Sequence, residues 1–224
     1  MVLEGARQVG VGLTPELIDQ LAYHARHLLE WNRSINLTAI TDPVDIAVKH
    51  LVDSLSIIPY LAGNKEILDI GAGGGFPGIP IAIVQPELAV TLVDAVAKKV
   101  SFIKAMIRGL ALSNSQAHHV RIEAFPKKRL EKKSHLLGYF DAIVSRALSN
   151  PETCLRLAIS HLAANGSILM MRGHVEKDIT PNLLSICREL LPHCESKVDI
   201  NPITLPFRND TRHIIVIQTT VNRL

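Results

Sequence analysis

The sequence has little cysteine, few aromatic residues and no long apolar run. Its three cysteines are Cys154, Cys187 and Cys194, and none belongs to a Cys-x-x-Cys pair. An odd number without that spacing argues against a disulfide framework and a thiolate zinc site, and it fits a reducing cytoplasm. No apolar stretch reaches the roughly 18 residues that a membrane-spanning helix needs. Residues 1–12 lack a basic flank followed by an apolar segment, so we expect no secretion signal.

The scarcity of aromatic residues limits how the chain could recognise nucleic acid. It has one Trp, three Tyr and five Phe, so we do not expect recognition of bases by many stacked aromatic side chains. The formal net charge of +3 permits a nucleic-acid partner without demanding one. The 224 residues are 47% hydrophobic and 20% charged, which is the balance of a globular protein. This length fits one large domain, or one domain with an N-terminal extension.

The first part of the chain carries helix signals. Thr14-Pro15-Glu16 predicts a helix start, because Thr caps free amides and Pro fits the first helical position. Apolar residues between Leu17 and Trp31 then fall near one face. Asp42-Pro43 starts a second helix that runs to about Ser56. We expect residues 1–62 to be an N-terminal helical extension packed on a main domain of residues 63–224.

From residue 66 the pattern alternates between strands and helices. Strands are predicted at 66–70, 89–94, 116–120, 140–145 and 167–171, and helices at 79–84, 98–109, 152–162 and up to about Cys194. Such alternation is typical of a parallel sheet covered on both faces. The last two strands, at 196–202 and 213–219, have no helix between them, so we expect an antiparallel pair at the sheet edge. The fold class is therefore α/β, a mostly parallel, doubly wound, Rossmann-like sheet.

A glycine-rich loop lies between the first strand and its helix. It runs from Asp69 to Gly78 and includes Gly71, Gly73 and Gly75. In an open parallel sheet, ligands bind beyond the carboxyl ends of the strands, at such a loop. The second strand ends in Asp94, whose carboxylate can accept both hydroxyls of a ribose. After the third strand, Ile122 and Glu123 could flank an adenine and accept a hydrogen bond from its exocyclic amine.

Two ligands fit this loop. Gly73, Gly75 and Gly78 satisfy the Gly-x-Gly-x-x-Gly pattern of dinucleotide binding. That match starts three residues beyond the apolar strand and places Pro77 inside the turn. The alternative is S-adenosylmethionine, whose usual loop is Asp-x-Gly-x-Gly-x-Gly, and this pattern starts at the strand end. We therefore favour the methyl donor over a dinucleotide, and over a glycine-rich turn without a ligand.

Several blocks of the sequence together resemble one family. The chain is similar over nearly its whole length to the glucose-inhibited division protein B family, the bacterial 16S ribosomal RNA guanine-N7 methyltransferases. The glycine loop alone would be weak evidence, but its continuation Phe76-Pro-Gly-Ile-Pro80 and the N-terminal Asn-Leu-Thr block are specific. The resemblance rests on Trp31-Asn32, Asn36-Leu-Thr38, His50-Leu-Val-Asp53-Ser54, Asp69 to Pro80, Leu92-Val-Asp94, Lys98 to Phe102, Val144-Ser-Arg146-Ala147, Arg172-Gly173 and Arg212-His213.

The resemblance implies a site as well as a reaction. It implies methyl transfer from S-adenosylmethionine to N-7 of a specific guanine in 16S rRNA of the small ribosomal subunit. The family's donor-contacting positions fall on Gly71, Phe76, Ile122, Glu123 and Arg146. Arg146 is also our catalytic candidate, because it closes the fourth strand beside the same crevice. Weaker candidates for contacts with the RNA are Asn36, His50, Arg172 and Arg212.

The expected chemistry needs no general base. Guanine N-7 has an in-plane lone pair and no proton at neutral pH, so the enzyme has to align that lone pair with the sulfur–methyl bond. The sequence agrees, since Ser149-Asn-Pro-Glu152 lacks the second Pro and the aromatic residue of the amino methyltransferases. Cys154, which would lie in a helix, is expected to be a small core residue rather than a nucleophile.

Some alternatives stay open from the sequence. Lys127 to Lys133 is more basic than is usual in the family, and it is either an RNA-contacting loop or solvated surface. The chain could also be a donor-binding, ribosome-associated module without turnover, or a methyltransferase acting on another RNA position or a small molecule. We expect no metal site, no membrane association, a monomer and a cytoplasmic location.

Overall fold

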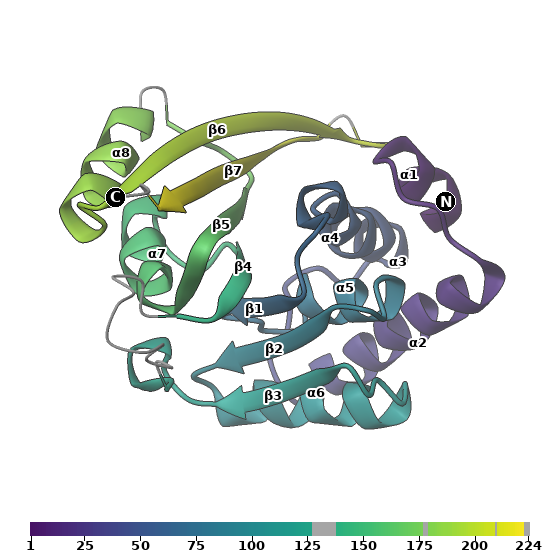
Figure 1. The fold of residues 1–224 in the computed structure, drawn as a ribbon. Helices are drawn as coiled ribbons and strands as arrows, with labels where there is room; N and C mark the ends of the chain where they lie inside the picture. The colour runs from purple at the N-terminus through teal and green to yellow at the C-terminus, as the bar shows by residue number, and fades with distance from the viewer. Residues whose placement is uncertain (127–137, 177–178, 209, 222–224) are drawn as a thin grey trace.

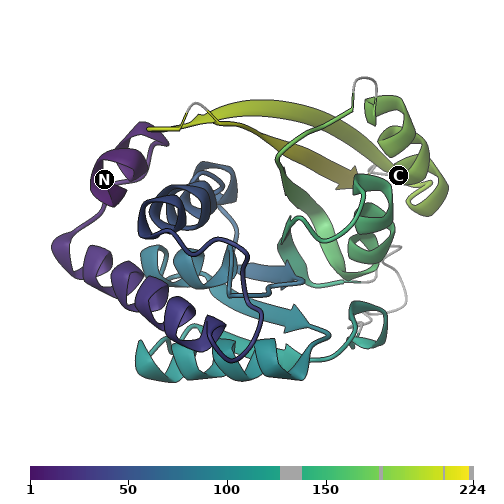
Figure 2. The same ribbon diagram turned by 180° about the vertical axis from the view of Figure 1, so that it is seen from behind.

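The structure is a computed structural model that describes residues 1–126, 138–176, 179–208 and 210–221. The N-terminal part consists of helices, and Figures 1 and 2 show them grouped beside the sheet. The caps predicted from the sequence are present, since Thr14 Oγ1 accepts the amide of Leu17 (3.4 Å) and Asp42 Oδ1 that of Asp45 (2.9 Å). These segments are α1 (Val2–Gln8), α2 (Pro15–Asn32), α3 (Pro43–Ile46), the π-helix η1 (Ala47–Val52), α4 (Asp53–Leu55) and the 3₁₀ turn η2 (Ile58–Leu61).

The remaining chain builds a mixed sheet in the order β3-β2-β1-β4-β5-β7-β6. All neighbours from β3 to β5 pair parallel, whereas β7 pairs antiparallel with both β5 and β6. The predicted α/β class and the antiparallel pair at the sheet edge are therefore confirmed. The strands are β1 (Glu66–Ile70), β2 (Ala89–Asp94), β3 (Ser115–His119), β4 (Phe140–Arg146), β5 (Leu162–Arg172), β6 (Cys194–Leu205) and β7 (Asp210–Val221).

Two hydrophobic cores cover the two faces of the sheet. Alternate residues of each central strand face opposite sides, so Val144 packs in one core and Ile143 in the other. The first core also takes in α2 and the N-terminal helices, with α5 (Gly78–Val84) and α6 (Ala97–Gly109). The second core takes in the 3₁₀ turn η3 (Ile122–Ala124), α7 (Pro151–Ala158), the 3₁₀ turn η4 (Ile159–His161) and α8 (Ile179–Leu190).

The register of β7 places its hairpin at the same edge of the sheet as the glycine loop. Arg172, the last residue of β5, lies opposite His213 near the start of β7. The turn between β6 and β7 therefore extends beyond the carboxyl ends of the parallel strands. In Figures 1 and 2 this hairpin arches across to α1. The loop, the strand ends and the hairpin tip thus share one edge.

Some elements differ from the sequence expectation. Helix α1 was not predicted, because its seven residues carry no capping side chain. The strands β6 and β7 are each 12 residues long, extending beyond the predicted runs, because the hairpin continues their pairing as far as Leu205 and Asp210. Within the described residues, no helix combines the length and apolar character that a membrane crossing requires.

Candidate active site

The glycine loop is tied to the neighbouring strand by its backbone. The amides of Gly71 and Ala72 both donate to the carbonyl of Val93, at 2.8 and 3.1 Å. Gly71 and Gly73 adopt the left-handed conformation, with φ of 72° and 56°. A side chain would be strained at either position, so the sequence needs glycine there. The loop therefore turns sharply at the end of β1 and presents its backbone to the crevice.

The carboxylates of Asp69 and Asp94 hold the loop by accepting hydrogen bonds from its backbone amides. Asp69 is fully buried, and its Oδ2 accepts the amide of Gly78 at the start of α5 (2.8 Å). Burial raises the pKa of Asp69 to about 7, against the opposing effect of that hydrogen bond and of Arg146. Asp94, at the end of β2, accepts the amide of Gly73 through Oδ2 (2.9 Å) and that of Val96 through Oδ1 (2.8 Å). Both carboxylates thus fix the backbone around the loop.

Two cavities meet at this loop. The larger, of about 390 Å³, extends from the glycines toward the end of β4. The smaller, of about 160 Å³, extends toward the end of β3. Both are lined by Gly71, Asp94, Ala95 and Leu148, so they adjoin along one wall. The larger cavity also includes Phe76, Lys99 and Arg146, and the smaller one Ile122 and Glu123.

Of the residues predicted to hold an S-adenosyl group, all but Gly75 line these two cavities. Ile122 is 7% exposed and offers an apolar wall, and the exposed Glu123 follows it in η3. Gly71 and Gly73 lie in the loop, and Asp94 lies at the shared wall. Gly75 contributes its left-handed φ of 81° to the turn and does not line either cavity. An elongated ligand with an adenine at one end and a charged group at the other would fit this pair of cavities.

The Phe76 side chain is buried and packs against the N-terminal helices. Its side chain is 3% exposed, and its ring stacks with His24 of α2 and His50 of η1, at centroid distances of 4.5 and 4.7 Å. His24 Nε2 also donates to the carbonyl of Gly74 (2.8 Å). Burial is the main cause that lowers the pKa of His24 to about 4 and that of His50 to about 3, so both rings are neutral at pH 7. The N-terminal helices therefore brace the glycine loop.

Arg146 joins the sheet to the N-terminal helical segment. Its Nη1 donates to the carbonyl of Lys49 (3.0 Å) and lies 3.5 Å from Oδ2 of Asp53. Its guanidinium carbon lies 4.9 Å from the centre of the Phe76 ring. The side chain is only 18% exposed, yet it lines the larger cavity. Arg146 is thus a partly buried cation at the wall of the site.

The segment of residues 36–38 forms another wall of the larger cavity through Leu37. Asn32 holds this segment, because its Oδ1 accepts the amides of Leu37 and Thr38 (2.8 and 3.0 Å) and its Nδ2 donates to the Thr38 carbonyl (3.0 Å). Thr38 Oγ1 is hydrogen-bonded to Nε2 of His50 (2.8 Å). Asn36 itself is exposed. The sequence reasoning missed the role of Asn32, although the Trp31-Asn32 block was visible.

The remaining candidate cations lie along the same edge on β5 and β7. Arg172 ends β5, and its Nε and Nη2 are buried without a hydrogen-bond partner in the described part of the chain. Burial lowers the pKa of Arg172. Arg212 of β7 lies near the Asp210 carboxylate (3.9 Å) and donates to the carbonyl of Thr211 (3.4 Å). Because the face alternates along a strand, Arg146 and Arg212 share one face of the sheet and Arg172 the other.

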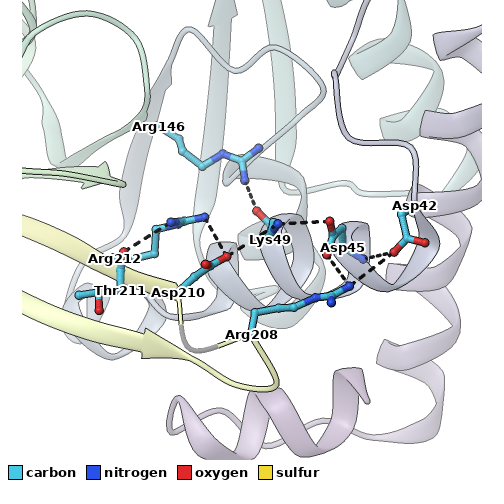
Figure 3. A network of polar contacts seen from close by, with 8 residues as sticks. All are labelled: Asp42, Asp45, Lys49, Arg146, Arg208, Asp210, Thr211 and Arg212. Carbon is cyan, nitrogen blue, oxygen red and sulfur yellow. Dashed lines mark hydrogen bonds and ion pairs between the residues drawn. The ribbon is translucent and has the colours of Figure 1, made fainter.

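Figure 3 shows how the hairpin is bound to the N-terminal segment. Arg208, at the hairpin tip, pairs with Asp45 (2.7 Å). Lys49 lies between Asp45 (3.2 Å) and Asp210 of β7 (3.8 Å), and its backbone carbonyl accepts from Arg146. This network connects β4, the N-terminal helices and the β6–β7 hairpin.

Few of the described side chains that line the larger cavity can gain or lose a proton. The titratable side chains lining the larger cavity are Asp94, Lys99 and Arg146. Among the described residues, no group of three or more side chains could hold a metal ion. Cys154 is fully buried and contacts Ser145 Oγ through Sγ (3.0 Å), as expected of a core cysteine. The basic run from Lys127 to Lys133 lies outside the described residues.

Comparisons with known proteins agree on one family. Residues 17–185 match the family described as GidB, rRNA small subunit methyltransferase G. The chain is 40% identical to Ribosomal RNA small subunit methyltransferase G of Geobacter metallireducens, over 97% of this chain and 94% of that protein. It is 33% identical to the protein of that name from Klebsiella pneumoniae, over 94% of this chain and 93% of that protein.

Solved structures with low sequence identity support the fold. M. jannaschii TYW2 in complex with AdoMet gives a TM-score of 0.53 at 13% identity, covering 71% of this chain and 70% of that chain. Trm5b from Pyrococcus abyssi gives a TM-score of 0.56 at 16% identity, covering 80% and 50%.

Proposed function

This chain belongs to the GidB family, rRNA small subunit methyltransferase G, and we propose that it transfers a methyl group from S-adenosylmethionine to N-7 of a guanine in 16S rRNA. It is an S-adenosylmethionine-dependent methyltransferase, and its substrate is rRNA of the small ribosomal subunit. That it acts as a monomer, without a metal and in the cytoplasm, stays a prediction.

The observation that carries the N-7 assignment is that the described residues lining the larger cavity offer no suitable base. Of its titratable lining residues, Lys99 and Arg146 are cations, and the Asp94 carboxylate is held by two backbone amides on the side of the cavity that we assign to the donor's ribose. A reaction that had to remove a proton would need an acceptor within hydrogen-bond reach. Guanine N-7 carries no proton at neutral pH, so its methylation requires only alignment. The described lining of the cavity therefore fits this acceptor better than an amino group.

We assign the donor to the two adjoining cavities. Gly71, Gly73 and Gly75 would shape the loop, and Asp94 would accept the ribose hydroxyls through the lone pairs that the amides leave. Ile122 and Glu123 would hold the adenine. Phe76 is too buried to offer its ring face, so it would contribute backbone and the ring edge. These residues fit the donor because the site combines an apolar wall, a backbone cradle and two charged ends.

Methyl transfer proceeds by displacement at carbon. S-adenosylmethionine supplies an electrophilic methyl group on a positively charged sulfur. In such a displacement the N-7 lone pair would form the new bond as the sulfur–carbon bond breaks toward sulfur, so that the positive charge would pass to the base. The protein's part is to hold the two reactants in line, which is a large contribution when the reacting atoms are kept at contact distance. Arg146 would do so by holding the methionine carboxylate, an RNA phosphate or the acceptor edge of guanine.

The RNA would lie over the outer part of the same edge. Arg172 has guanidinium nitrogens without partners in the described residues, and Arg212 and the exposed Asn36 lie along that edge. Lys99 lines the cavity and could hold a phosphate. His50 is 7% exposed and would act through Thr38 rather than by touching the RNA. Lys and Arg supply most of the affinity for a phosphate backbone.

The test is a methylation assay with labelled S-adenosylmethionine and small ribosomal subunits that lack the modification. We expect 7-methylguanosine in the digested 16S rRNA, identified by mass spectrometry. Binding to the subunits without methyl incorporation would indicate a module without turnover. A different methylated nucleoside would move the reaction to another RNA position. Deproteinised 16S rRNA, assayed in parallel, identifies which form is the substrate.

A further inference from the structure

The helical segment that contacts Arg146 contains a widened turn. In an α-helix, the amide of Asp53 would donate to the carbonyl four residues earlier, which is that of Lys49. Here that amide instead donates to the carbonyls of Val48 and His50, at the end of the π-helix η1. The carbonyl of Lys49 accepts from Nη1 of Arg146 at 3.0 Å (Figure 3). Single π-helical turns often occur at functional sites, and this one releases an acceptor toward Arg146.

Asp53 adds a charged partner to the same nitrogen. Its side chain is 6% exposed, and Oδ2 lies 3.5 Å from Nη1 of Arg146. Its Oδ1 has no hydrogen-bond partner among the described residues. Burial raises the pKa of Asp53, and the neighbouring Arg146 acts in the opposite direction. A carboxylate so deeply buried is costly unless a cation faces it. Arg146 and, less strongly, Arg212 supply that charge, and Arg146 is the one within 3.5 Å.

The two contacts restrain one side of the Arg146 guanidinium. Both use Nη1, and in the described part of the chain neither Nε nor Nη2 has a recorded hydrogen bond. The guanidinium also lies over the Phe76 ring, which limits its tilt. Because Nη1 is held and Phe76 restricts the tilt of the planar guanidinium, the remaining N–H donors of Arg146 point in a defined direction.

We propose that Asp53, together with the Lys49 carbonyl, positions Arg146 for methyl transfer. This inference rests on the proposed function, because Arg146 is the residue that would hold the reactants. Asp53 touches neither donor nor base and acts through Arg146. The part of the N-terminal segment that touches Arg146, namely Asp53 and the Lys49 carbonyl, then contributes to catalysis and does more than support the fold. A purely structural ion pair would tether the segment to the sheet without affecting the turnover of folded enzyme.

The experiment compares Asp53→Asn with a matched control, Asp45→Asn. Asp45 lies in the same segment, and its carboxylate pairs with Lys49 and Arg208 rather than with Arg146. Turnover and the KM for the donor are measured with small ribosomal subunits, and the folded fraction by circular dichroism. We expect Asp53→Asn to lower turnover per folded molecule at least tenfold, with the donor KM changed less than twofold. Asp45→Asn should change turnover less than twofold. Equal turnover in folded Asp53→Asn and wild type would overturn the proposal.

A double-mutant cycle separates positioning from general damage. In an Arg146→Lys background, Asp53→Asn should cost less than twofold in turnover, because its effect passes through the guanidinium. If the double variant loses turnover by the product of the two single losses, the residues act independently and the proposal is contradicted. If Asp53→Asn does not fold, Asp53→Glu supplies the same comparison, because it keeps the charge but changes the distance to Nη1. It should recover less than half of wild-type turnover, and full recovery would count against the proposal.

A spectroscopic measurement makes the result independent of the reaction. A guanidinium held by a carboxylate and a carbonyl rotates slowly, so its Nη nitrogens give separate nuclear magnetic resonance signals. We expect resolved Nη signals for Arg146 in the wild type, retained in Asp45→Asn and merged in Asp53→Asn. If the wild type does not methylate subunits, the proposed function fails, and these signals still test whether Asp53 restrains Arg146. Merged signals in the wild type would refute the restraint.

Discussion

The two halves of the carboxyl edge of the sheet are built from different chemistry. Beside β1, β2 and β3, backbone amides and carboxylates form the site, with Gly73 bound to Asp94 and Gly78 to Asp69. Beside β4, β5 and β7, the edge carries cationic side chains: Arg146 lines the larger cavity, and Arg172 and Arg212, at the end of β5 and near the start of β7, are the candidates that we propose for RNA contacts. A small donor with hydroxyls and an adenine suits the first half. A polyanion suits the second.

The halves also differ in how far their polar groups are already satisfied. Asp94 uses both oxygens on amides of its own chain, so the donor half is organised before a ligand arrives. Arg172 has buried nitrogens without partners in the described residues. A buried donor without a partner is costly, so the cationic half gains more from an added anion. The difference suggests a preformed donor site and an RNA side whose hydrogen bonds are completed by the substrate.

The largest effect is expected at the boundary between the halves. Arg146→Ala should lower methyl transfer about a hundredfold, because ~1 Å of misplacement can cost that much. The donor should still raise the melting temperature, since the loop and Asp94 remain. Removing Arg146 leaves Asp53 buried without its cation, which costs about 3–5 kcal/mol, so turnover is calculated per folded molecule. Arg146→Ala combined with Asp53→Asn should regain stability without activity. Recovery of activity at high pH would mean that a base is involved after all.

The next effect tests the donor half alone. Asp94→Ala should weaken donor binding by about 1–3 kcal/mol, roughly 5- to 150-fold, as calorimetry can measure. Asp141→Ala is the matched control, because Asp141 also accepts two backbone amides, those of Lys65 and Glu66, at the opposite end of the strands. The control should leave the donor affinity within twofold of wild type. A similar loss in both variants would show that Asp94 acts only through the fold.

A smaller effect tests the cationic half. Arg172→Ala should weaken binding to 16S rRNA several-fold and reduce the salt slope of the binding constant by about one. Donor affinity should not change. Lys197→Ala is the control, because Lys197 of β6 is 70% exposed, pairs with Asp199 and lies far along the hairpin from the tip. The same slope in Arg172→Ala and wild type would remove Arg172 from the RNA contacts.

The smallest effect on catalysis is expected for His24→Phe. This substitution should instead change how the free energy of unfolding depends on pH in the acidic range. The pKa of His24 is about 4 in the folded protein, against an ordinary value of 6.5. The unfolded chain therefore binds the extra proton first, and the wild type loses free energy of unfolding as the pH falls from 6.5 toward 4. His24→Phe keeps a ring against Phe76 but cannot titrate, so urea unfolding should give a shallower loss over that window. Parallel curves for the two proteins would contradict the low pKa. Methyl transfer at pH 7.5 should change less than threefold.

The glycine loop and the alternation of elements could be predicted because both are local. Strand ends, caps and left-handed glycines depend on residues a few positions apart, as at Thr14 and Gly73. The parallel topology then brings the loop, Asp94 and Arg146 to one edge without further information. Cys154 was predicted to be a small core residue because its stretch predicts a helix, and it is fully buried.

The contacts that complete the site join residues far apart in the chain. His24 meets Gly74 fifty positions later, and Asp53 meets Arg146 ninety-three positions later. Neither pair could be read from the sequence, because both depend on how the N-terminal helices pack on the sheet. The π-turn that frees the Lys49 carbonyl is likewise a result of that packing. By itself, the sequence determined the fold class, the loop and the strand ends that carry the site, because neighbouring residues decide them. Only the tertiary structure decided which nitrogen of Arg146 is held and which residues hold it, since such directions arise from packing between distant elements.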